Sequence, residues 1–241
     1  MLQILKFGSA CIFDKYGKLN TKYVEKKATE IENLTNEGID SVLVVSGAIP
    51  YGMLLENEKR KKEELSTVEL QGYASVGQPK LMNLYDDLFS LNTGQLLITI
   101  DDLIDSNKVK NLIDENRNKK RISLINWNDS TDFDQLRLDN DVPAGVITNY
   151  CNASRLIMFL GGDYDCFIRN NEKVFDLSSI KEINKQYNFC IDKSNLGNGG
   201  FESKLNCAKI ILDSKAKMYI SHVKYDLDDI LQKKVPVTYV A

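Results

Sequence analysis

The sequence predicts an α/β protein, a three-layer αβα sandwich with a mainly parallel central sheet. Short segments that are apolar throughout alternate with longer segments whose apolar residues recur every three or four positions. Strands without a polar face are typical of a parallel sheet that helices cover on both sides. The chain has 241 residues, 43% of them hydrophobic, which is enough for a substantial core. No repeat or linker-like segment interrupts it, so we expect a single domain over residues 1–241.

The first part of the chain is expected to contribute strands and helices in alternation. Strands are predicted at 2–7 (LQILKF), 41–46 (SVLVVS), 95–100 (QLLITI) and 121–126 (RISLIN). Helices are predicted from Val24 to a stop at Gly38, from Leu70 to Leu88, over 103–116 and over 142–150, because the apolar residues there keep a helical spacing. The charged stretch 56–64 (ENEKRKKEE) is interpreted as a solvated excursion or a mobile flap.

The second part of the chain begins with another apolar strand, 155–160 (RLIMFL), which ends in Gly161 and Gly162. A polar stretch follows, and then a helix whose apolar face contains Phe201, Leu205 and Ala208. Segments 217–221 and 236–240 are predicted as the final strands.

Composition excludes several classes of protein. The net charge of −3 and the isoelectric point near 5.4 give no electrostatic reason to expect nucleic acid binding. No apolar run approaches the length of a membrane span, and MLQILKFGS is too short and too quickly polar for a signal peptide. The five cysteines include no CxxC pair, which indicates reduced, mostly buried thiols in a cytoplasmic protein. The single histidine, His222, favours a structural role over a zinc site or a catalytic triad.

Small and polar residues follow the predicted strands. In parallel sheets covered by helices, ligands lie beyond the carboxyl ends of the strands. The segments at those ends are 6–9 (KFGS), 46–48 (SGA), 126–129 (NWND) and 161–163 (GGD). Glycines, amides and carboxylates would therefore gather at one edge, which predicts a site for an anionic ligand.

The stretch NLGNGGFESK (195–204) places three glycines in four positions just before a predicted helix. A lysine in the first turn of a helix opposes the macrodipole, so Lys204 is unfavourable there unless an anion shares the position. Backbone amides of a glycine-rich turn, together with a lysine, suit a phosphate group. Taken alone, the segment favours the simpler interpretation, an ordinary flexible loop followed by a surface lysine.

Five segments, in a fixed order, carry a resemblance to a known family. They are LKFGS (5–9), VLVVSGAIPYG (42–52), ASVGQPKLMNLY (74–85), INWNDS (125–130) with LDND (138–141), and GNGGFESK (197–204). With TGQLLIT (93–99), they extend over almost the whole chain. On these motifs the sequence resembles the amino acid kinase family, and within it the glutamate 5-kinases. It looks like the short form, without the C-terminal RNA-binding-like PUA domain of some relatives.

The resemblance implies transfer of the γ-phosphoryl group of ATP to the side-chain carboxylate of L-glutamate, giving glutamyl 5-phosphate in the first step of proline biosynthesis. Mg²⁺ is the expected cofactor, because the charge of the triphosphate exceeds what two lysines offset. Lys6 and Lys204 would clamp the transferred group as point charges, and Asp141 would orient both lysines. Replacing Lys204 by alanine should then lower turnover and leave stability unchanged or slightly improved.

The resemblance also assigns binding residues. About residues 1–150 would form the acceptor side, where Asp129 would bind the ammonium group of the amino acid and Ser46 and Asn140 its α-carboxylate, with Gly47 beside them. About residues 151–241 would form the nucleotide side. The residues assigned to the nucleotide are Gly8, Ser9, Asp163, Gly197, Asn198, Gly199 and Gly200. We expect a homo-oligomer, a dimer or a tetramer, whose partners are small molecules and neither nucleic acid nor a membrane.

Several features leave alternatives open. Without the family order, Asp139, Asn140 or Asp141 would simply cap the helix that begins near residue 142. Trp127 and Leu138 stand where relatives have Glu and Gly, and Asn198 stands in place of Thr. After the strand RLIMFL, an ungapped alignment puts the nucleotide-site aspartate on Gly162, and a slip of one residue puts it on Asp163. One alternative function is transfer to a different small acid, phosphonate or phosphate. Another is a catalytically weakened paralogue that binds amino acid or nucleotide as a sensor.

Overall fold

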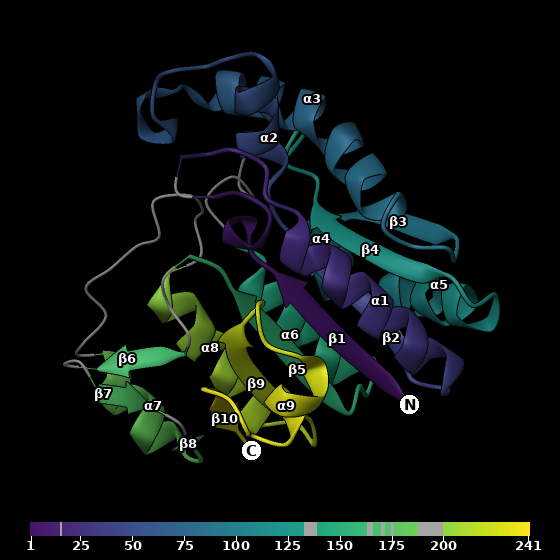
Figure 1. Cartoon of the computed structure of the whole chain (residues 1–241), viewed down its shortest axis with the longest axis vertical. Helices are drawn as coiled ribbons and strands as arrows, with labels where there is room; N and C mark the ends of the chain where they lie inside the picture. The colour runs from purple at the N-terminus through teal and green to yellow at the C-terminus, as the bar shows by residue number, and fades with distance from the viewer. Residues whose placement is uncertain (15, 133–138, 163–165, 170–171, 175, 188–199) are drawn as a thin grey trace.

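The computed structural model describes residues 1–14, 16–132, 139–162, 166–169, 172–174, 176–187 and 200–241. Its main sheet has eight strands: β1 (Leu2–Phe7), β2 (Asp40–Val45), β3 (Thr93–Ile98), β4 (Ile122–Trp127), β5 (Arg155–Leu160), β8 (Asp176–Leu177), β9 (Lys217–His222) and β10 (Thr238–Val240). They lie in the order β3-β4-β2-β1-β5-β9-β10-β8 (Figure 1). Neighbouring strands from β3 to β9 are parallel, β10 is antiparallel to β9, and β8 is parallel to β10.

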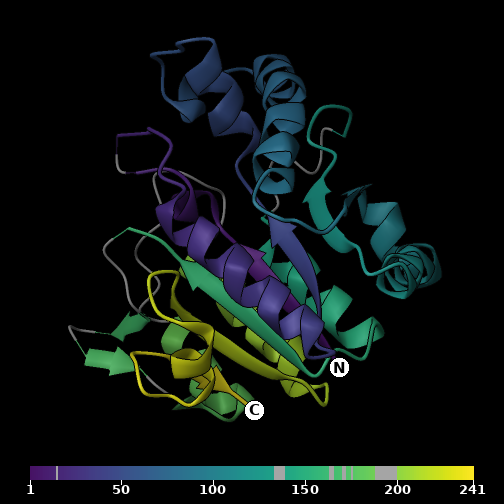
Figure 2. The same cartoon turned by 45° about the vertical axis from the view of Figure 1, so that its right-hand side comes forward.

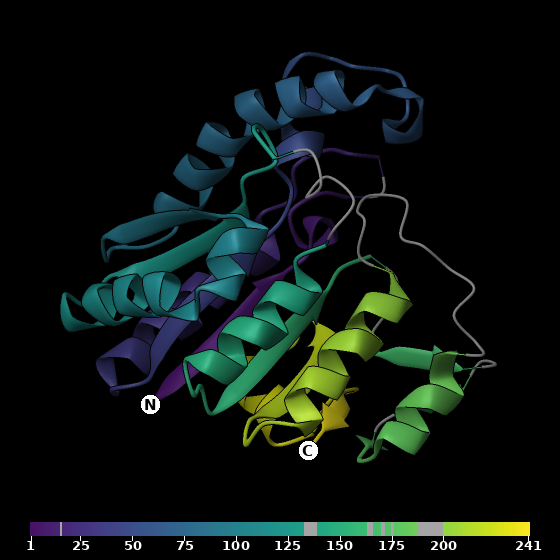
Figure 3. The ribbon, with the colours of Figure 1, turned by 180° about the vertical axis from the view of Figure 1, so that it is seen from behind.

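Helices cover this sheet on both faces. The long helices are α1 (Lys22–Asn36), α3 (Thr67–Asp86), α5 (Ser106–Asn118), α6 (Asp141–Tyr150) and α8 (Phe201–Leu212). One core cluster lies between the sheet and α1, the C-terminal half of α3 and the short α9 (Leu227–Leu231), and the other lies between the sheet and α5, α6 and α8. Figure 2 shows α1 lying along the first face, and Figure 3 shows α6 and α8 side by side on the second. The predicted three-layer architecture with a mainly parallel sheet is confirmed.

Helix α2 (Ala48–Leu55) packs closely against α3 because two glycines leave room for the neighbouring backbone. A Cβ at Gly52 would lie 2.0 Å from the carbonyl oxygen of Tyr73, and a Cβ at Gly77 would lie 1.8 Å from that of Ala48. No side chain fits at such distances. This contact holds the start of α2 beside the middle of α3.

Replacing Gly77 by alanine is therefore expected to destabilise the protein by about 3 kcal/mol, at the upper end of the usual cost of overpacking. Gly72→Ala on the same helix is the matched control, because a Cβ at Gly72 would meet nothing within 4 Å. Alanine there should stabilise the protein by about 0.5–1 kcal/mol. Urea denaturation of both variants measures the difference. A loss below about 1 kcal/mol for Gly77→Ala would mean that α2 and α3 move apart easily.

The observed boundaries differ from the predicted ones mainly in the middle of the chain. Strand β3 ends at Ile98, two residues before the predicted end, because Thr99 starts a helix with a capping box. Its Oγ1 accepts from the backbone N of Asp102 (3.3 Å), and Oδ2 of Asp102 accepts from the backbone N of Thr99 (2.9 Å). The helix predicted over 103–116 is two helices, α4 (Ile100–Ile104) and α5, because the backbone of Asp105 between them is not helical (φ −91°, ψ 76°).

The structure also contains elements that the sequence did not predict. They are α2, the antiparallel hairpin β6 (Phe167–Arg169) and β7 (Glu172–Val174), strand β8, α7 (Ile180–Tyr187) and α9. Helix α2 has almost no polar face, so it gives no periodic signal. The strands among them are only two or three residues long. The final strands β9 and β10 were both predicted.

The charged stretch 56–64 is mostly exposed, as predicted, and an ionic network ties it to α3. The carboxylate of Glu58 accepts from Oη of Tyr73 (2.5 Å) and from the guanidinium of Arg60 (2.7 Å). Arg60 also donates to Glu69 (2.8 Å). The short 3-10 helix η2 (Lys62–Glu64) follows.

The described cysteines agree with the prediction of buried thiols. Cys11, Cys166 and Cys207 are buried, Cys151 is partly buried, and all four are free. Cys190 lies outside the described residues. In the described ranges, no helix combines the length and the apolar character needed to cross a bilayer.

Candidate functional site

Three charged side chains from three elements meet at the carboxyl end of β1. Side chains alternate along a strand, so Lys6 lies on the same face of the sheet as Leu2 and Ile4, the face that α6 and α8 cover. Its Nζ lies 2.5 Å from Oδ1 of Asp141, the first residue of α6. Nζ of Lys204, the fourth residue of α8, lies 2.8 Å from Oδ2 of the same carboxylate. The structure thus brings together the three residues predicted to be catalytic.

The close packing of α6 on α8 lets these charges meet. Gly145 permits it, because a Cβ there would lie 2.7 Å from Sγ of Cys207. The side chain of Asp141 is fully buried, and the side chains of Lys6 and Lys204 are 6% and 12% exposed. Two ammonium groups share one buried carboxylate, where screening by water is weak. Such an arrangement favours the binding of an additional anion.

Burial and neighbouring charges act against each other on these groups. Burial alone would raise the pKa of Asp141, but the charges of Lys204 and Lys6 hold that pKa well below its ordinary value. Burial alone would lower the pKa of Lys6, but Asp141 and Asp139 keep it above its ordinary value. Burial and the charge of Asp141 raise the pKa of Asp139. Asp141 and Lys6 therefore stay charged at neutral pH.

The unfavourable position of Lys204 in the first turn of α8 is compensated within the protein. The sequence requires an anion there, and Oδ2 of Asp141 supplies it without a bound phosphate. Ser203 strengthens the contact, because its Oγ donates to Oδ2 of Asp141 (2.7 Å) and also lies 3.0 Å from the carbonyl oxygen of Gly200. Lys204 is consequently part of a buried ion pair, and the expectation that its removal leaves stability unchanged does not fit this geometry.

The described nucleotide-site residues lie on both sides of the lysine pair. A Cβ at Gly8 would lie 3.7 Å from Nζ of Lys6, and buried Ser9 begins the 3-10 helix η1 (Ser9–Cys11). Gly200 is the N-cap of α8, with its carbonyl oxygen 3.5 Å from Nζ of Lys204. The remaining predicted residues, Asp163, Gly197, Asn198 and Gly199, lie outside the described residues.

The turn after β5 lies directly against the turn after β1. A Cβ at Gly161 would lie 1.9 Å from the carbonyl oxygen of Ala10. Gly162 follows with φ +73°, and its carbonyl oxygen accepts from Nε2 of His222 (2.9 Å). Nδ1 of His222 accepts from the backbone N of Lys224 (2.9 Å), which requires the proton to be on Nε2. His222 therefore holds this turn in place, a structural role as predicted.

The predicted acceptor side contains a chain of hydrogen-bonded amides. Nδ2 of Asn140 faces three acceptors, the carbonyl oxygen of Val45 (2.9 Å), Oγ of Ser46 (2.7 Å) and Oδ1 of Asn126 (3.0 Å). Nδ2 of Asn126 in turn donates to Oε1 of Gln78 on α3 (2.7 Å). The chain joins the ends of β2 and β4 to the start of α6 and the middle of α3.

These contacts refine the roles predicted for the acceptor residues. Asn140, whose amide was expected to donate to a substrate, uses that amide within the protein. Its Oδ1 has no hydrogen-bond partner among the residues that the structure describes. Ser46 accepts from Asn140 and keeps its own O–H for donation. The side chain of Asn140 does not cap α6, and instead Oδ1 of Asp139 accepts from the backbone N of Asp141 (2.6 Å). Gly47 turns the chain from β2 into α2 with φ +125°, a value that favours glycine.

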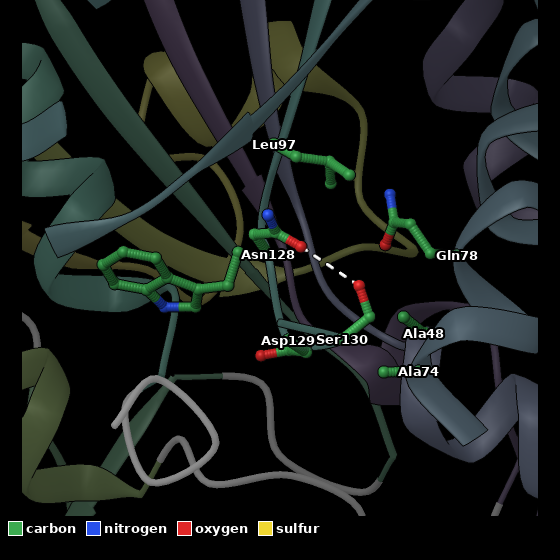
Figure 4. Close-up of a pocket in the computed structure, with 8 residues that line it drawn as sticks. Ala48, Ala74, Gln78, Leu97, Asn128, Asp129 and Ser130 are labelled. Carbon is green, nitrogen blue, oxygen red and sulfur yellow. Dashed lines mark hydrogen bonds between the residues drawn. The ribbon is translucent and has the colours of Figure 1, made fainter. Parts of the chain in front are cut away.

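Asp129 lines a small pocket next to this amide chain, between α3 and the carboxyl ends of β3 and β4 (Figure 4). The empty space in and around the pocket, open solvent included, is about 150 Å³. Trp127 forms part of its wall, and its indole Nε1 donates to the carbonyl oxygen of Asp139 (3.2 Å). The residues that line it are Ala48, Ala74, Gln78, Leu97, Trp127, Asn128, Asp129 and Ser130.

Burial raises the pKa of Asp129 from 3.8 to about 6, although the nearby charge of Lys62 opposes the rise. An ionised Asp129 therefore weakens the fold above pH 6, and this cost disappears as the pH falls toward 4. We expect Asp129→Asn to raise the free energy of unfolding by about 3 kcal/mol at pH 7.5 and by less than about 1 kcal/mol at pH 4. Urea denaturation at both pH values tests this, with Glu115→Gln, at an exposed position, as control. Equal effects at the two pH values would contradict it.

Several residues of the site were not assigned from the sequence. Ser203 precedes Lys204 within GNGGFESK, Gln78 lies within ASVGQPKLMNLY, and Asn126 lies within INWNDS, so the motifs contained them. Their roles depend on contacts between distant segments, which spacing does not give. Nothing in the sequence marked Lys62 as a site residue, because it stands in a run of charged residues.

Known proteins resemble this chain over most of its length. A sequence profile of the amino acid kinase family matches residues 1–222. The chain is 30% identical over 236 residues to the glutamate 5-kinase of Thermoanaerobacter sp. (strain X514), covering 92% of this chain and 62% of that protein. It is 31% identical over 234 residues to the glutamate 5-kinase of Clostridium perfringens (strain 13 / Type A), covering 91% of this chain and 86% of that protein. The chain thus spans less than two thirds of the first relative and most of the second.

Solved structures of kinases have the same fold. The carbamate kinase from Giardia lamblia bound to AMP-PNP superposes with a TM-score of 0.65 at 14% identity, over 99% of this chain and 97% of that one. The UMP kinase from Ureaplasma parvum gives a TM-score of 0.63 at 14% identity, over 100% of this chain and 98% of that one. At such identities the likeness establishes the fold alone. Together with the profile match and the relatives at 30–31% identity, it shows that this chain belongs to the amino acid kinase family.

Proposed function

We propose that this chain transfers the γ-phosphoryl group of ATP to the side-chain carboxylate of L-glutamate, forming glutamyl 5-phosphate and ADP. The observation that carries the proposal is the pair of lysines held on one buried carboxylate, Lys6 and Lys204 on Asp141. The two glutamate 5-kinases described above match almost the whole chain, which supports glutamate as the acceptor. The product would enter proline biosynthesis.

In this reaction a carboxylate oxygen of glutamate attacks the γ-phosphorus, and the bond from that phosphorus to the β–γ bridging oxygen breaks. Negative charge accumulates on the transferred group and on the departing ADP. Lys6 and Lys204 would offset that charge as fixed point charges, which need no rearrangement during the step. Asp141 acts as a positioning residue, because it holds two ammonium groups close together that would otherwise repel each other.

The two parts of the chain would divide the substrates between them. We assign the acceptor to the side formed mainly by about residues 1–150, which contains Ser46, Gly47, Asp129 and Asn140. We assign the nucleotide mainly to the side formed by about residues 151–241, with Gly8, Ser9 and Gly200 facing it. Asp163 and the loop 197–199 belong to this proposal from the sequence alone.

Mg²⁺ fits this proposal as an ion that arrives with the nucleotide. In the part of the chain that the structure describes, no three His, Cys, Asp or Glu side chains gather so that they could hold a metal ion. Both oxygens of Asp141 already contact lysines. Magnesium would be held mainly by triphosphate oxygens, where it offsets charge that two lysines leave uncompensated.

An ADP-release assay with Mg²⁺-ATP and a panel of small acids tests the proposal. The panel includes glutamate, aspartate, N-acetylglutamate, carbamate and UMP, and hydroxylamine traps any acyl phosphate as a hydroxamate. We expect glutamate to give both ADP and hydroxamate, and excess EDTA to abolish both. Lys204→Ala, purified in parallel, controls for contaminating kinases. ADP release with another acceptor and not with glutamate would reject glutamate as the substrate, and binding of glutamate without turnover would reject the kinase.

A further inference from the structure

The amide chain at the acceptor side has a fixed direction. The carbonyl oxygen of Val45 can only accept a hydrogen bond, so Asn140 must turn its Nδ2 toward it (2.9 Å). That nitrogen also faces Asn126 (3.0 Å), so Asn126 must present its Oδ1. Nδ2 of Asn126 then faces Gln78 (2.7 Å), so Gln78 must present its Oε1. One backbone carbonyl thus determines the orientation of three side-chain amides.

The last amide in the chain is left with a free donor. Because Oε1 of Gln78 is used by Asn126, its Nε2 points away from the amide chain, and no atom of the described residues accepts from it. Gln78 is only 7% exposed, so this nitrogen is also shielded from bulk water. A buried N–H₂ without a partner is unfavourable, and a ligand oxygen would relieve that cost.

The free donor belongs to a residue that lines the Asp129 pocket. Figure 4 shows Gln78 on one side of this pocket, with its amide oxygen on the side of Asn128 and Ser130 and its amide nitrogen turned toward the Leu97 side. The pocket therefore combines an amide donor with a carboxylate, and Lys62 adds a positive charge close to Asp129. An α-amino acid carries the complementary groups, a carboxylate that accepts and an ammonium that donates.

We propose that Nε2 of Gln78 donates a hydrogen bond to the α-carboxylate of the acceptor amino acid and is a specificity-determining residue of the enzyme. This inference rests on the proposed function, because it takes the bound amino acid to be the phosphoryl acceptor. A site built around such a donor discriminates strongly against a ligand that cannot accept at that position. The residue therefore selects α-amino acids over acids in which the α-carboxylate is missing or masked.

Gln78→Glu tests this role with little disturbance of the surroundings. A carboxylate oxygen at position 78 still accepts from Nδ2 of Asn126, so the amide chain is kept, while the Nε2 donor becomes an acceptor. The two substrates are glutamate and glutamate α-amide, which keeps the side-chain carboxylate and presents an amide N–H₂ in place of one α-carboxylate oxygen. We expect kcat/KM for glutamate to fall about 10- to 100-fold, mainly through KM, with the KM for ATP unchanged. For the α-amide, kcat/KM should hold or rise.

The ratio of the two kcat/KM values is the decisive quantity, because it does not depend on the fraction of folded enzyme. Gln71→Glu places the same charge on the same helix at a residue outside the pocket lining and should leave the ratio unchanged. Gln78→Met removes the donor without adding a charge. It should bring the kcat/KM values for the two substrates closer together. An unchanged ratio in Gln78→Glu would overturn the inference while the kinase assignment stands.

A binding measurement without ATP separates this inference from the proposed function. Calorimetric titration of glutamate and of its α-amide should show the same reversal of preference between the wild type and Gln78→Glu. If the wild type binds glutamate without phosphorylating it, the proposed function fails and the reversal still supports the role of Gln78. If the wild type prefers the α-amide to glutamate, the inference is wrong whatever the activity.

Discussion

Replacing Asp141 by asparagine is expected to remove measurable turnover and to lower the free energy of unfolding by about 3–5 kcal/mol. Asp141 is fully buried and is the shared counter-charge of Lys6 and Lys204. Asparagine has nearly the same shape but no charge, and its N–H₂ would face one of the two ammonium groups. Two buried positive charges would then lose their shared counter-charge, with Asp139 still acting on Lys6, and this is the costly way to break a buried ion pair. Urea denaturation at pH 7.5 and the ADP-release assay measure the two effects.

The pH dependence of this loss has a definite sign. The two lysines hold the pKa of Asp141 below its ordinary value, so its contribution is present above about pH 4 and is lost as the pH falls further. The difference between the wild type and Asp141→Asn should therefore shrink at acidic pH. Asp139→Asn is the matched control, because an amide oxygen still accepts from the backbone N of Asp141 while a carboxyl disfavoured by burial is removed. If Asp141→Asn and Asp139→Asn had the same free energy of unfolding, the two buried lysines would not need the charge of the Asp141 carboxylate.

The sheet and the edge that holds the candidate site could be predicted because they follow from local patterns. Segments such as LQILKF and RLIMFL are mostly apolar and have no alternating polar face, and each is a buried strand of the sheet. Once the strands are parallel, their carboxyl ends share an edge, which places Lys6 near the start of α6 without further information. The helices α1, α3 and α6 were predicted because their apolar residues face one side at a helical spacing.

The missed elements lack such patterns for physical reasons. Helix α2 (AIPYGMLL) is hydrophobic all round, and it is a helix because Gly52 and Gly77 let it pack on α3. The hairpin β6–β7 and strand β8 are too short to show alternation. Strand β3 ends early because Thr99 forms a capping box and starts a helix. The apolar pattern over 95–100 does not reveal this capping box.

The charged residues of the candidate site could be predicted from the sequence, but its hydrogen bonds could not. The argument that Lys204 needs an anion beside it was correct, but the anion in this structure is Asp141, from a helix 63 residues earlier in the chain. The chain from Gln78 through Asn126 to Asn140 joins three segments, and its direction depends on a single backbone carbonyl. Sequence spacing predicts that these residues approach one another, but it does not determine which atom of each amide faces which.

Replacing Lys204 by alanine is expected to lower kcat about 10²–10³-fold while changing the KM for ATP much less. The reason is that a fixed ammonium group would act on charge that develops on the transferred phosphoryl group, more strongly in the transition state than in the ground state. The same variant should lose about 2 kcal/mol of stability, because Asp141 loses one charged partner and keeps Lys6 at 2.5 Å and Ser203 at 2.7 Å. Removing the unfavourable charge from the first turn of α8 recovers only part of this loss.

Two further variants make the Lys204 result specific. Lys209→Ala removes a lysine from the last turn of the same helix and should leave kcat close to normal. Lys204→Arg keeps the charge but replaces a compact ammonium with a planar, bulkier group, so it should retain more stability than alanine and still lose much of the rate. Initial-rate kinetics with ATP varied at saturating glutamate, together with urea denaturation, separate the two effects. Near-normal turnover in Lys204→Ala combined with reduced stability would mean that Lys204 only compensates Asp141, because an ammonium group that acts on the transferred phosphoryl cannot be removed without a loss of rate.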